Sequence, residues 1–241
     1  MNVMSTASFG VGHTLSFVLG VIGSEASRVL EVGAGSGELA AHLASRGHRV
    51  LAVDSSLDAV LEARTRGVDA RHVAWPDFAG GPFDFVLFTR SLHHIGPLEQ
   101  ALRRASEVLT LDGRAVVEDF AFHDAGRETV HWFRENLEKL RPEMRGDGRS
   151  FACRLLDAND PIDEWTRDAD HFHSAEAMRE ALNDVFEIEM ESAVPYVYRY
   201  LEPLLPASRV AEFAEAETEA IAQGSIRPLG RRYVARVQNT A

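Results

Sequence analysis

The sequence has 241 residues, 45% of them hydrophobic and 26% charged, which is typical of a folded enzyme with a substantial core. Its formal net charge of −12 argues against a nucleic-acid partner, because proteins that bind nucleic acids carry a basic patch or stripe. The single cysteine, Cys153, excludes an intrachain disulfide framework and a zinc site made of several thiolates, and it fits a reducing cytoplasm.

The first predicted element is an apolar N-terminal segment that is too short to cross a membrane. It runs from Phe9 to Ile22, whereas a membrane-spanning helix needs roughly 20 apolar residues. No basic region precedes it, so it lacks the pattern of a secretory signal. Residues 13–19 predict a short amphipathic helix. We therefore expect a cytoplasmic protein without a membrane partner.

A glycine-rich stretch follows. The apolar, β-prone residues 28–32 lead into three glycines at alternate positions and then into a helical pattern. Glycine suits such a strand-to-helix turn because it adopts unusual backbone angles and lets a ligand approach the backbone N–H groups closely. A dinucleotide fingerprint, G-x-G-x-x-G, would place its third glycine at position 38, where this sequence has Glu38. The pattern here is G-x-G-x-G.

This stretch, preceded by Glu31, resembles the first motif of class I S-adenosylmethionine-dependent methyltransferases, of the small-molecule type with a methyltransferase-11/12-like domain. The resemblance implies S-adenosyl-L-methionine as the cofactor. It also implies that an N-terminal helix lies across the cofactor mouth, so Phe9 and His13 are either lid residues or residues packed against the sheet. The motif residues that it assigns to cofactor binding are Glu31, Gly33, Ala34, Gly35 and Gly37.

Residues 49–54 predict a second buried strand, which ends in Asp54, 17 positions after Gly37. A carboxylate at this point can accept hydrogen bonds from both hydroxyls of a ribose, a requirement that NAD enzymes and methyltransferases share. The alternative is that Asp54 caps the helix predicted over residues 56–66. Ser55, next to it, is a further candidate for cofactor binding.

The third strand is predicted over residues 69–73, and Ala74 and Trp75 follow it. In the family that the chain resembles, this point often carries an acidic residue that contacts the adenine amino group. The sequence departs from that pattern. Adenine recognition is therefore left to backbone groups around Ala74, to Asp77, or to stacking on Trp75, which equally fits a core position.

Residues 83–88 predict the fourth strand, and a Leu-His-His stretch with His93 and His94 comes shortly after it. Small-molecule methyltransferases of this group commonly carry both features. Thr89 and Arg90 lie at the carboxyl end of the strand, where open α/β sheets bind ligands. Arg90 is either a clamp for a carboxylate or a surface arginine paired with an acid. One histidine is expected to pack on the cofactor, and His94 is a candidate for proton transfer.

After a helix over residues 97–109, residues 114–120 predict the fifth strand, and residues 184–191 and 232–237 predict the last two. Strands that alternate with helices indicate a doubly wound parallel sheet. The family that the chain resembles usually closes its sheet with an antiparallel pair. We therefore expect an α/β fold: a doubly wound, seven-stranded, Rossmann-like sheet with an antiparallel last strand and helical lid insertions.

The whole chain is expected to form one class I methyltransferase domain. Its parts are an N-terminal helical lid, a cofactor-binding core and two helical substrate-cap segments, at residues 1–27, 28–125, 126–183 and 195–228. Within the cap segments we predict helices over residues 127–141, 174–182 and 208–222, and a loop over residues 141–161. The helix over residues 208–222 carries an acidic run, which predicts a face exposed to solvent. The alternative interpretation is that this run attracts a cationic substrate. Before it, a tyrosine cluster predicts an aromatic lid, at Tyr196, Tyr198 and Tyr200.

The candidate general base is His123, with Asp124 beside it, just after the fifth strand. Histidine titrates near neutrality, and this strand end faces the site in the expected fold. The alternative is a loop histidine without a role. Asp119 is either a site carboxylate or a helix-capping group, and His171 and His173 are further candidates for the base if the segment that carries them folds over the pocket. No metal site is predicted, because no group of residues has diagnostic ligand spacing.

Together these features predict transfer of a methyl group from S-adenosylmethionine to O or N of a small-molecule acceptor. A neutral hydroxyl or an ammonium must lose a proton, so a general base helps, whereas a carboxylate acceptor needs none. Two alternatives remain: an NAD-linked oxidoreductase on the same kind of sheet, and a noncatalytic S-adenosylmethionine-binding protein, which the departure at Ala74 keeps open. We expect a monomer or a homodimer.

Overall fold

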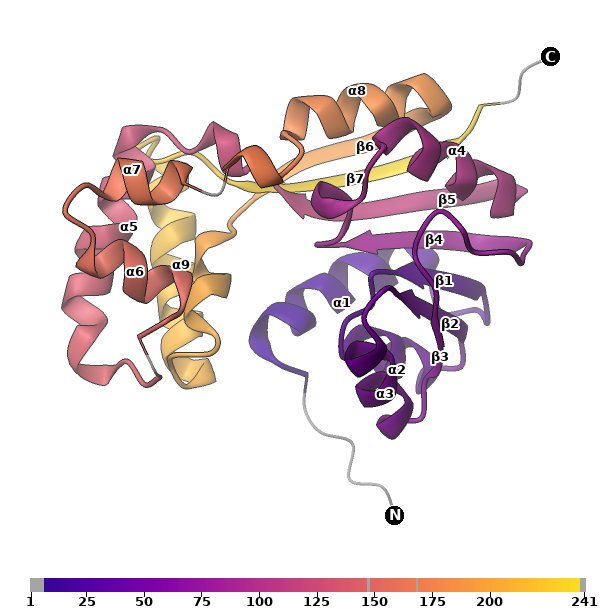
Figure 1. Cartoon of the computed structure of the whole chain (residues 1–241), viewed down its shortest axis with the longest axis horizontal. Coiled ribbons are helices and arrows are strands. Elements are labelled where there is room, and N and C mark those ends of the chain that lie inside the picture. The colour runs from indigo at the N-terminus through magenta and orange to yellow at the C-terminus, as the bar shows by residue number, and fades with distance from the viewer. Residues whose placement is uncertain (1–6, 147, 168, 239–241) are drawn as a thin grey trace.

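A computed structural model describes residues 7–146, 148–167 and 169–238 (Figure 1). Within them, seven strands form one mixed sheet in the order β3-β2-β1-β4-β5-β7-β6. The first five strands run parallel, and β7 lies antiparallel between β5 and β6. This confirms the predicted doubly wound sheet with its antiparallel last strand. The strands are β1 Arg28–Val32, β2 Arg49–Asp54, β3 Asp69–His72, β4 Phe83–Thr89, β5 Leu109–Phe120, β6 Phe186–Val194 and β7 Gly230–Val237.

Helices cover both faces of the sheet, because its central strands are apolar on both sides. Successive side chains of a strand point to opposite faces, so Leu30 joins the core beneath one set of helices and Val29 the core beneath the other. In Figure 1, α4 and α8 lie on one side and α1, α2 and α3 on the other. Their bounds are α1 Phe9–Ile22, α2 Glu38–Ala44, α3 Leu57–Thr65, α4 Leu98–Val108 and α8 Ala175–Val185.

Two of these elements are longer than predicted. α1 buries Val11, Leu15 and Val18 and ends at Gly23, which has a φ of 74°, so the helix extends beyond residues 13–19 at both ends. β5 begins five residues early, because Leu109 already pairs with Phe83 of β4. The pairing then shifts register before Phe85, which lets residues 109–113 continue the strand instead of forming a separate turn.

A second cluster of helices, which we call the cap, stands beside the sheet (Figure 1). Its own core includes Phe133, Leu155, Trp165 and Phe213. The predicted loop over residues 141–161 is wrong in part, because Ser150 accepts a hydrogen bond from the N–H of Cys153 and starts a helix. The cap elements are α5 Arg127–Leu140, η3 Arg141–Glu143, α6 Phe151–Asp157, α7 Pro161–Thr166, η5 Val197–Leu201 and α9 Ala207–Ala222.

Two expectations for the cap need correction. α8 packs on the sheet through Met178 and Leu182, although it was placed in the cap segment 126–183. The acidic run of α9 is solvated as predicted at Glu212, Glu215 and Glu219, which are exposed. Glu217 departs from the prediction: it is buried, because its carboxylate accepts hydrogen bonds from three consecutive backbone N–H groups at the start of η5. The donors are Tyr196, Val197 and Tyr198.

The carboxyl ends of β1, β2, β4 and β5 meet at one edge of the sheet, since these strands are parallel. Short 3₁₀ turns follow two of them, η1 Leu92–His94 after β4 and η2 Phe122–Asp124 after β5, and a third, η4 Ala169–His171, precedes α8. No helix in the described part of the chain has the length and apolar character needed to cross a bilayer.

Candidate functional site

Two adjoining cavities open at this edge of the sheet. The larger has a volume of about 590 Å³ and reaches from the glycine-rich loop to the aromatic side chains of the cap. The smaller, of about 350 Å³, extends over the ends of β2 and β3. The two share Gly33, Arg90 and His94. A single elongated ligand can therefore reach from one to the other past these three residues.

The glycine-rich loop forms the floor between the cavities. Gly33, Gly35 and Gly37 all have left-handed φ angles, of 69°, 54° and 72°. The N–H groups of Gly33 and Ala34 both donate to the carbonyl of Val53, at 2.8 and 3.3 Å, which ties the loop to β2. A side chain at Gly35 would meet nothing within 4 Å, and Gly35 lines the larger cavity. The loop thus leaves its backbone accessible to a ligand.

Replacing Gly33 with alanine is expected to destabilise the protein by at least roughly 2 kcal/mol, because of the left-handed φ and the added volume. The new Cβ would lie 2.5 Å from Cβ of Ser91, which is held by a 2.7 Å hydrogen bond to the carbonyl of Val32. Urea unfolding measures the loss. Gly20→Ala, at an exposed helical site with no neighbour within 4 Å, is the control and should be neutral or slightly stabilising. Equal effects of the two substitutions would contradict this account.

Glu31 ends β1 beneath the loop and is only 2% exposed. Its Oε1 accepts a 3.0 Å hydrogen bond from the Thr89 hydroxyl, whereas Oε2 is buried without any hydrogen-bond partner. Burial raises the pKa of Glu31 to about 7, against the opposing effects of Thr89 and the Arg90 charge. A buried carboxylate oxygen without a partner is costly, so this oxygen is suited to a cationic group of a ligand.

Asp54 ends β2 and lines the smaller cavity. One carboxylate oxygen accepts a 2.9 Å hydrogen bond from the N–H of Gly35 and the other a 2.8 Å bond from the N–H of Ser56. The helix-cap alternative is wrong, since Ser56 caps α3 by accepting from Ala59. Each oxygen keeps a further lone pair for a ligand hydroxyl.

Ser55, Ala74 and Trp75 line the smaller cavity as well. The Trp75 indole N–H donates to the carbonyl of Ala101 at 2.9 Å, and the ring lies 6.0 Å from Phe88, edge to face. Trp75 is therefore anchored in the core while one part of it faces the cavity. The core position of Trp75 is thus confirmed, and stacking on the adenine stays a prediction.

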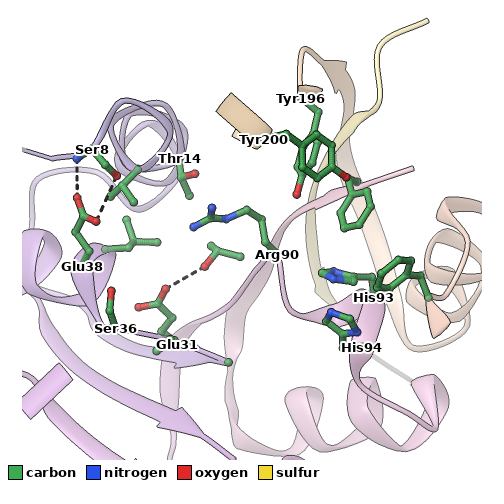
Figure 2. Close-up of a pocket in the computed structure, with 18 of the residues that line it drawn as sticks. Ser8, Thr14, Glu31, Ser36, Glu38, Arg90, His93, His94, Tyr196 and Tyr200 are labelled. Carbon is green, nitrogen blue, oxygen red and sulfur yellow. Dashed lines mark hydrogen bonds between the residues drawn. The ribbon is translucent and has the colours of Figure 1, made fainter. Parts of the chain in front are cut away.

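Arg90 stands at the junction of the two cavities. It has a φ of 60°, unusual for a residue with a side chain, and its N–H donates to the carbonyl of Glu118 at 2.7 Å. Figure 2 shows its guanidinium between Thr14 and Glu31, on the cavity side of β4. Such a backbone conformation at a ligand site indicates a functional constraint on the side-chain direction.

The two histidines of η1 differ in surroundings. His93 is buried, and its Nδ1 lies 2.7 Å from Oδ1 of Asp119, whose Oδ2 accepts from the His93 backbone N–H at 3.1 Å. His94 lines both cavities. Burial first, and then the neighbouring His93 and His173, lower the pKa of His94, against the effect of Asp119. The prediction that His94 lies at the site agrees with this placement.

His123 and Asp124 are not brought to the site. His123 is exposed and lines neither cavity, while Asp124 forms a 2.6 Å ion pair with Arg231 of β7. The chain turns into η2 after Phe120, which directs Phe122 inward and His123 outward. The expectation that these two residues form the general base therefore has no geometric support, whereas His93, which contacts Asp119, does line the larger cavity.

Sequence reasoning missed most of the wall that the cap contributes. Tyr196 and Tyr200 line the larger cavity, as the tyrosine cluster predicted. The phenylalanines of this wall carried no sequence signal of their own, because each comes from a different segment. They are Phe120, Phe122, Phe151 and Phe172.

The N-terminal helix closes the other side of the cavity. Ser8, Val11 and Thr14 line it, and the backbone N–H of Ser8 donates to the Glu38 carboxylate at 2.6 Å. The predicted lid residues Phe9 and His13 pack elsewhere: their rings lie 4.6 Å apart and both contact Tyr198. The N-terminal segment thus lines the cavity through residues other than the two predicted, and its role as a lid stays a prediction.

Comparison with known families gives a match over most of the chain. A family described as methyltransferase domain matches residues 11–184, which is well over half of the chain. The match covers every residue of the glycine-rich loop, the ends of β2 and β4, and the two histidines.

Two curated proteins are similar to part of the chain. An uncharacterized methyltransferase of Staphylococcus carnosus is 33% identical over 99 residues, 39% of this chain and 48% of that protein. A demethylmenaquinone methyltransferase of Beutenbergia cavernae is 35% identical over 98 residues, 39% of this chain and 41% of that protein. The chain thus spans about half the length of the curated relatives it matches, or less.

Among solved structures, the fold is similar to that of a geranyl diphosphate C-methyltransferase from Streptomyces coelicolor, in complex with Mg²⁺, geranyl diphosphate and S-adenosyl-L-homocysteine. The TM-score is 0.60 at 15% identity, over 94% of this chain and 77% of that one. At this identity the likeness concerns the fold alone.

Proposed function

The chain belongs to this methyltransferase-domain family, and we propose from it that the protein transfers a methyl group from S-adenosylmethionine to a small-molecule acceptor. The observation that carries the proposal is the unpartnered, buried Oε2 of Glu31 beneath the glycine-rich loop. S-adenosylmethionine carries an ammonium, a carboxylate and a ribose with two hydroxyls. The residues at the two cavities offer a partner of matching chemistry for each.

Glu31 would hold the ammonium, because a carboxylate oxygen without a partner gains a charge-assisted hydrogen bond. Arg90 would hold the carboxylate from the junction of the cavities. Asp54 would accept from the ribose hydroxyls, since its remaining lone pairs lie in the smaller cavity. Ser55, Ala74 and Trp75 line the space left for the adenine.

The bound cofactor supplies an electrophilic methyl group on sulfur. The chain's own residues then have to hold an acceptor in line with that methyl and keep water away, and such positioning supplies much of the rate enhancement. The larger cavity extends past Glu31 and Arg90 to the cap, so it has room for an acceptor next to the cofactor. The geranyl diphosphate enzyme, named for a small-molecule substrate, supports an acceptor of that class. We propose transfer to O or N.

Calorimetric titration tests the proposal. S-adenosylmethionine and S-adenosylhomocysteine should bind the protein. Asp54→Ala should lower the affinity for both by at least about 30-fold, because it removes two hydrogen bonds from the ligand to a charged group and the hydrogen bond from the N–H of Gly35. The control is Asp58→Ala, an exposed acid on α3, which should leave the affinity within about twofold. Binding of NAD in place of both ligands would overturn the proposal and favour the oxidoreductase alternative.

A further inference from the structure

The cap end of the larger cavity has an aromatic lining that the cofactor does not need. Phe120 and Tyr196 stack with centroids 4.8 Å apart and planes 19° from parallel. The ring of Phe172 is packed edge to face with those of Phe120 and Phe122, with ring centroids 5.7 and 5.2 Å apart. Walls of this kind favour a flat, conjugated molecule, because ring stacking adds to the burial of apolar area. On the proposed function, this molecule is the methyl acceptor.

The groups here that can accept a proton are few. Burial raises the pKa of Tyr196 and Tyr200, so both phenols stay neutral. The guanidinium groups of Arg90 and Arg154 offer N–H donors and no acceptor. Within the described lining of this end, the imidazoles of His93 and His94 are then the side chains with a nitrogen lone pair that can accept a proton.

Asp119 distinguishes the two histidines. Its oxygens accept from the backbone N–H groups of His93 and Phe120, at 3.1 and 2.9 Å, as an ionised carboxylate does. The Nδ1 atom of His93, 2.7 Å from the same carboxylate, therefore carries its proton towards Asp119, and Nε2 keeps a free lone pair. Since His93 lines the cavity, this lone pair is available to a ligand. The arrangement orients a base as a buried aspartate orients histidine in hydrolase triads.

We propose that His93 is the general base and Asp119 its positioning residue, and that the acceptor is a flat aromatic or conjugated molecule with a phenolic or enolic hydroxyl. This rests on the proposed function. The hydroxyl proton moves to Nε2 of His93 as the acceptor oxygen forms a bond to the methyl carbon. The electron pair of the broken carbon–sulfur bond stays on sulfur, which becomes a neutral thioether. The imidazolium, stabilised by Asp119, then returns its proton to water.

Other titratable groups lie near His93 and influence its protonation. His94 neighbours it in η1, with ring centroids 4.0 Å apart, and the backbone N–H of His173, before α8, donates to the His93 carbonyl at 2.9 Å. Arg90 and Tyr196 face the same cavity from the β4 and η5 sides. The experiment therefore compares matched ligands at one pH instead of relying on a titration curve.

The probes are 7-hydroxycoumarin and 7-methoxycoumarin, added to protein saturated with S-adenosylhomocysteine. Both are flat and fluorescent, and they differ only at the hydroxyl. We expect 7-hydroxycoumarin to bind with an increase in its phenolate excitation band. His93→Gln should lower the affinity for 7-hydroxycoumarin at least tenfold and abolish the increase in its phenolate band. The affinity for 7-methoxycoumarin should stay within about twofold of that of the native protein. Asp119→Asn should also abolish the band increase, and His131→Gln on the exposed face of α5 should change nothing.

The outcomes separate the two proposals. If S-adenosylhomocysteine does not bind the native protein, the proposed function fails. If it binds normally, the inference fails on any of three results: neither coumarin binds, the phenolate band does not increase, or His93→Gln weakens both probes equally. S-adenosylhomocysteine affinity reports the integrity of each variant, and His93→Gln alone decides the case if Asp119→Asn does not fold.

Discussion

Replacing Glu31 with glutamine is expected to lower the affinity for S-adenosylmethionine about 100-fold at pH 8, or roughly 3 kcal/mol of binding free energy, because a charge-assisted contact to the ammonium is lost. Glutamine keeps the shape of the side chain and can still accept from the Thr89 hydroxyl, as Oε1 of Glu31 does at 3.0 Å. The substitution thus removes the charge and little else. Calorimetry on both proteins measures the difference.

The same substitution should change the dependence on pH. Because burial raises the pKa of Glu31 to about 7, the free protein holds a proton there below neutrality and must release it to bind an ammonium. Affinity should fall roughly tenfold per pH unit below pH 7 in the native protein and stay flat in Glu31→Gln. Glu25→Gln, at an exposed site, is the control. Parallel pH profiles for native protein and Glu31→Gln would refute this role of Glu31.

The free energy of unfolding of the unliganded protein should depend on pH in the opposite sense to the affinity for S-adenosylmethionine. A carboxyl whose pKa is higher in the folded state than in the unfolded chain stabilises the fold below pH 4.5 and loses that contribution as the pH rises to about 7. The stability of Glu31→Gln relative to native protein should therefore rise by roughly 3 kcal/mol across this range. Urea unfolding at pH 4.5 and pH 8 measures it. Glu31 thus lowers the stability of the unliganded protein while it favours binding.

Replacing Arg199 with methionine is expected to destabilise the protein by roughly 3–5 kcal/mol, because it leaves a buried charge with fewer partners. Arg199 donates to Glu118 at 2.6 Å and to the Thr14 hydroxyl at 3.0 Å. Arg232 donates to the other oxygen of Glu118 at 2.7 Å. Although burial disfavours the charged form, the two arginines hold the pKa of Glu118 below its usual value.

Two comparisons test this expectation in urea unfolding. Arg114→Met removes a half-exposed pair with Glu189 and should cost less than about 1 kcal/mol. The double replacement Glu118→Leu with Arg199→Met should recover part of the loss, since it removes the stranded charge together with its partner. If Arg199→Met costs no more than Arg114→Met, the buried ion pair does not stabilise the junction of α1, the sheet and the cap.

The sheet and the cofactor end of the site were predictable because their signals are local. Residues 28–32 and 49–54 are short apolar runs bounded by turns, and three glycines 33–37 stand where the backbone requires left-handed φ angles. The position of Asp54 at the site follows from its place at the end of a predicted strand. Each of these inferences needs only neighbours in the sequence and the rules of parallel sheets.

The acceptor end was not predictable in the same way, because it depends on contacts between distant segments. Whether His93, His94 or His123 faces the cavity is decided by the two 3₁₀ turns, in which successive side chains point about 120° apart. The pairing of His93 with Asp119 joins residues 26 positions apart. Phe151 and Phe172 reach the cavity only because the cap folds over the end of β5.

The junction at Glu118 has a consequence for biosynthesis. Thr14 is made early, but Arg199, to which it bonds, follows 185 positions later, and Arg232 later still. A nascent chain that stops before Arg199 has Glu118 without either guanidinium. Its cap core also lacks Leu201, Val210 and Phe213, so the apolar residues Phe133 and Leu155 lose part of their cover. Exposed apolar surface of this kind is what chaperones and proteases recognise. Synthesis of residues 199–232 therefore completes this junction and the cap core, and products terminated before Arg199 are expected to be degraded.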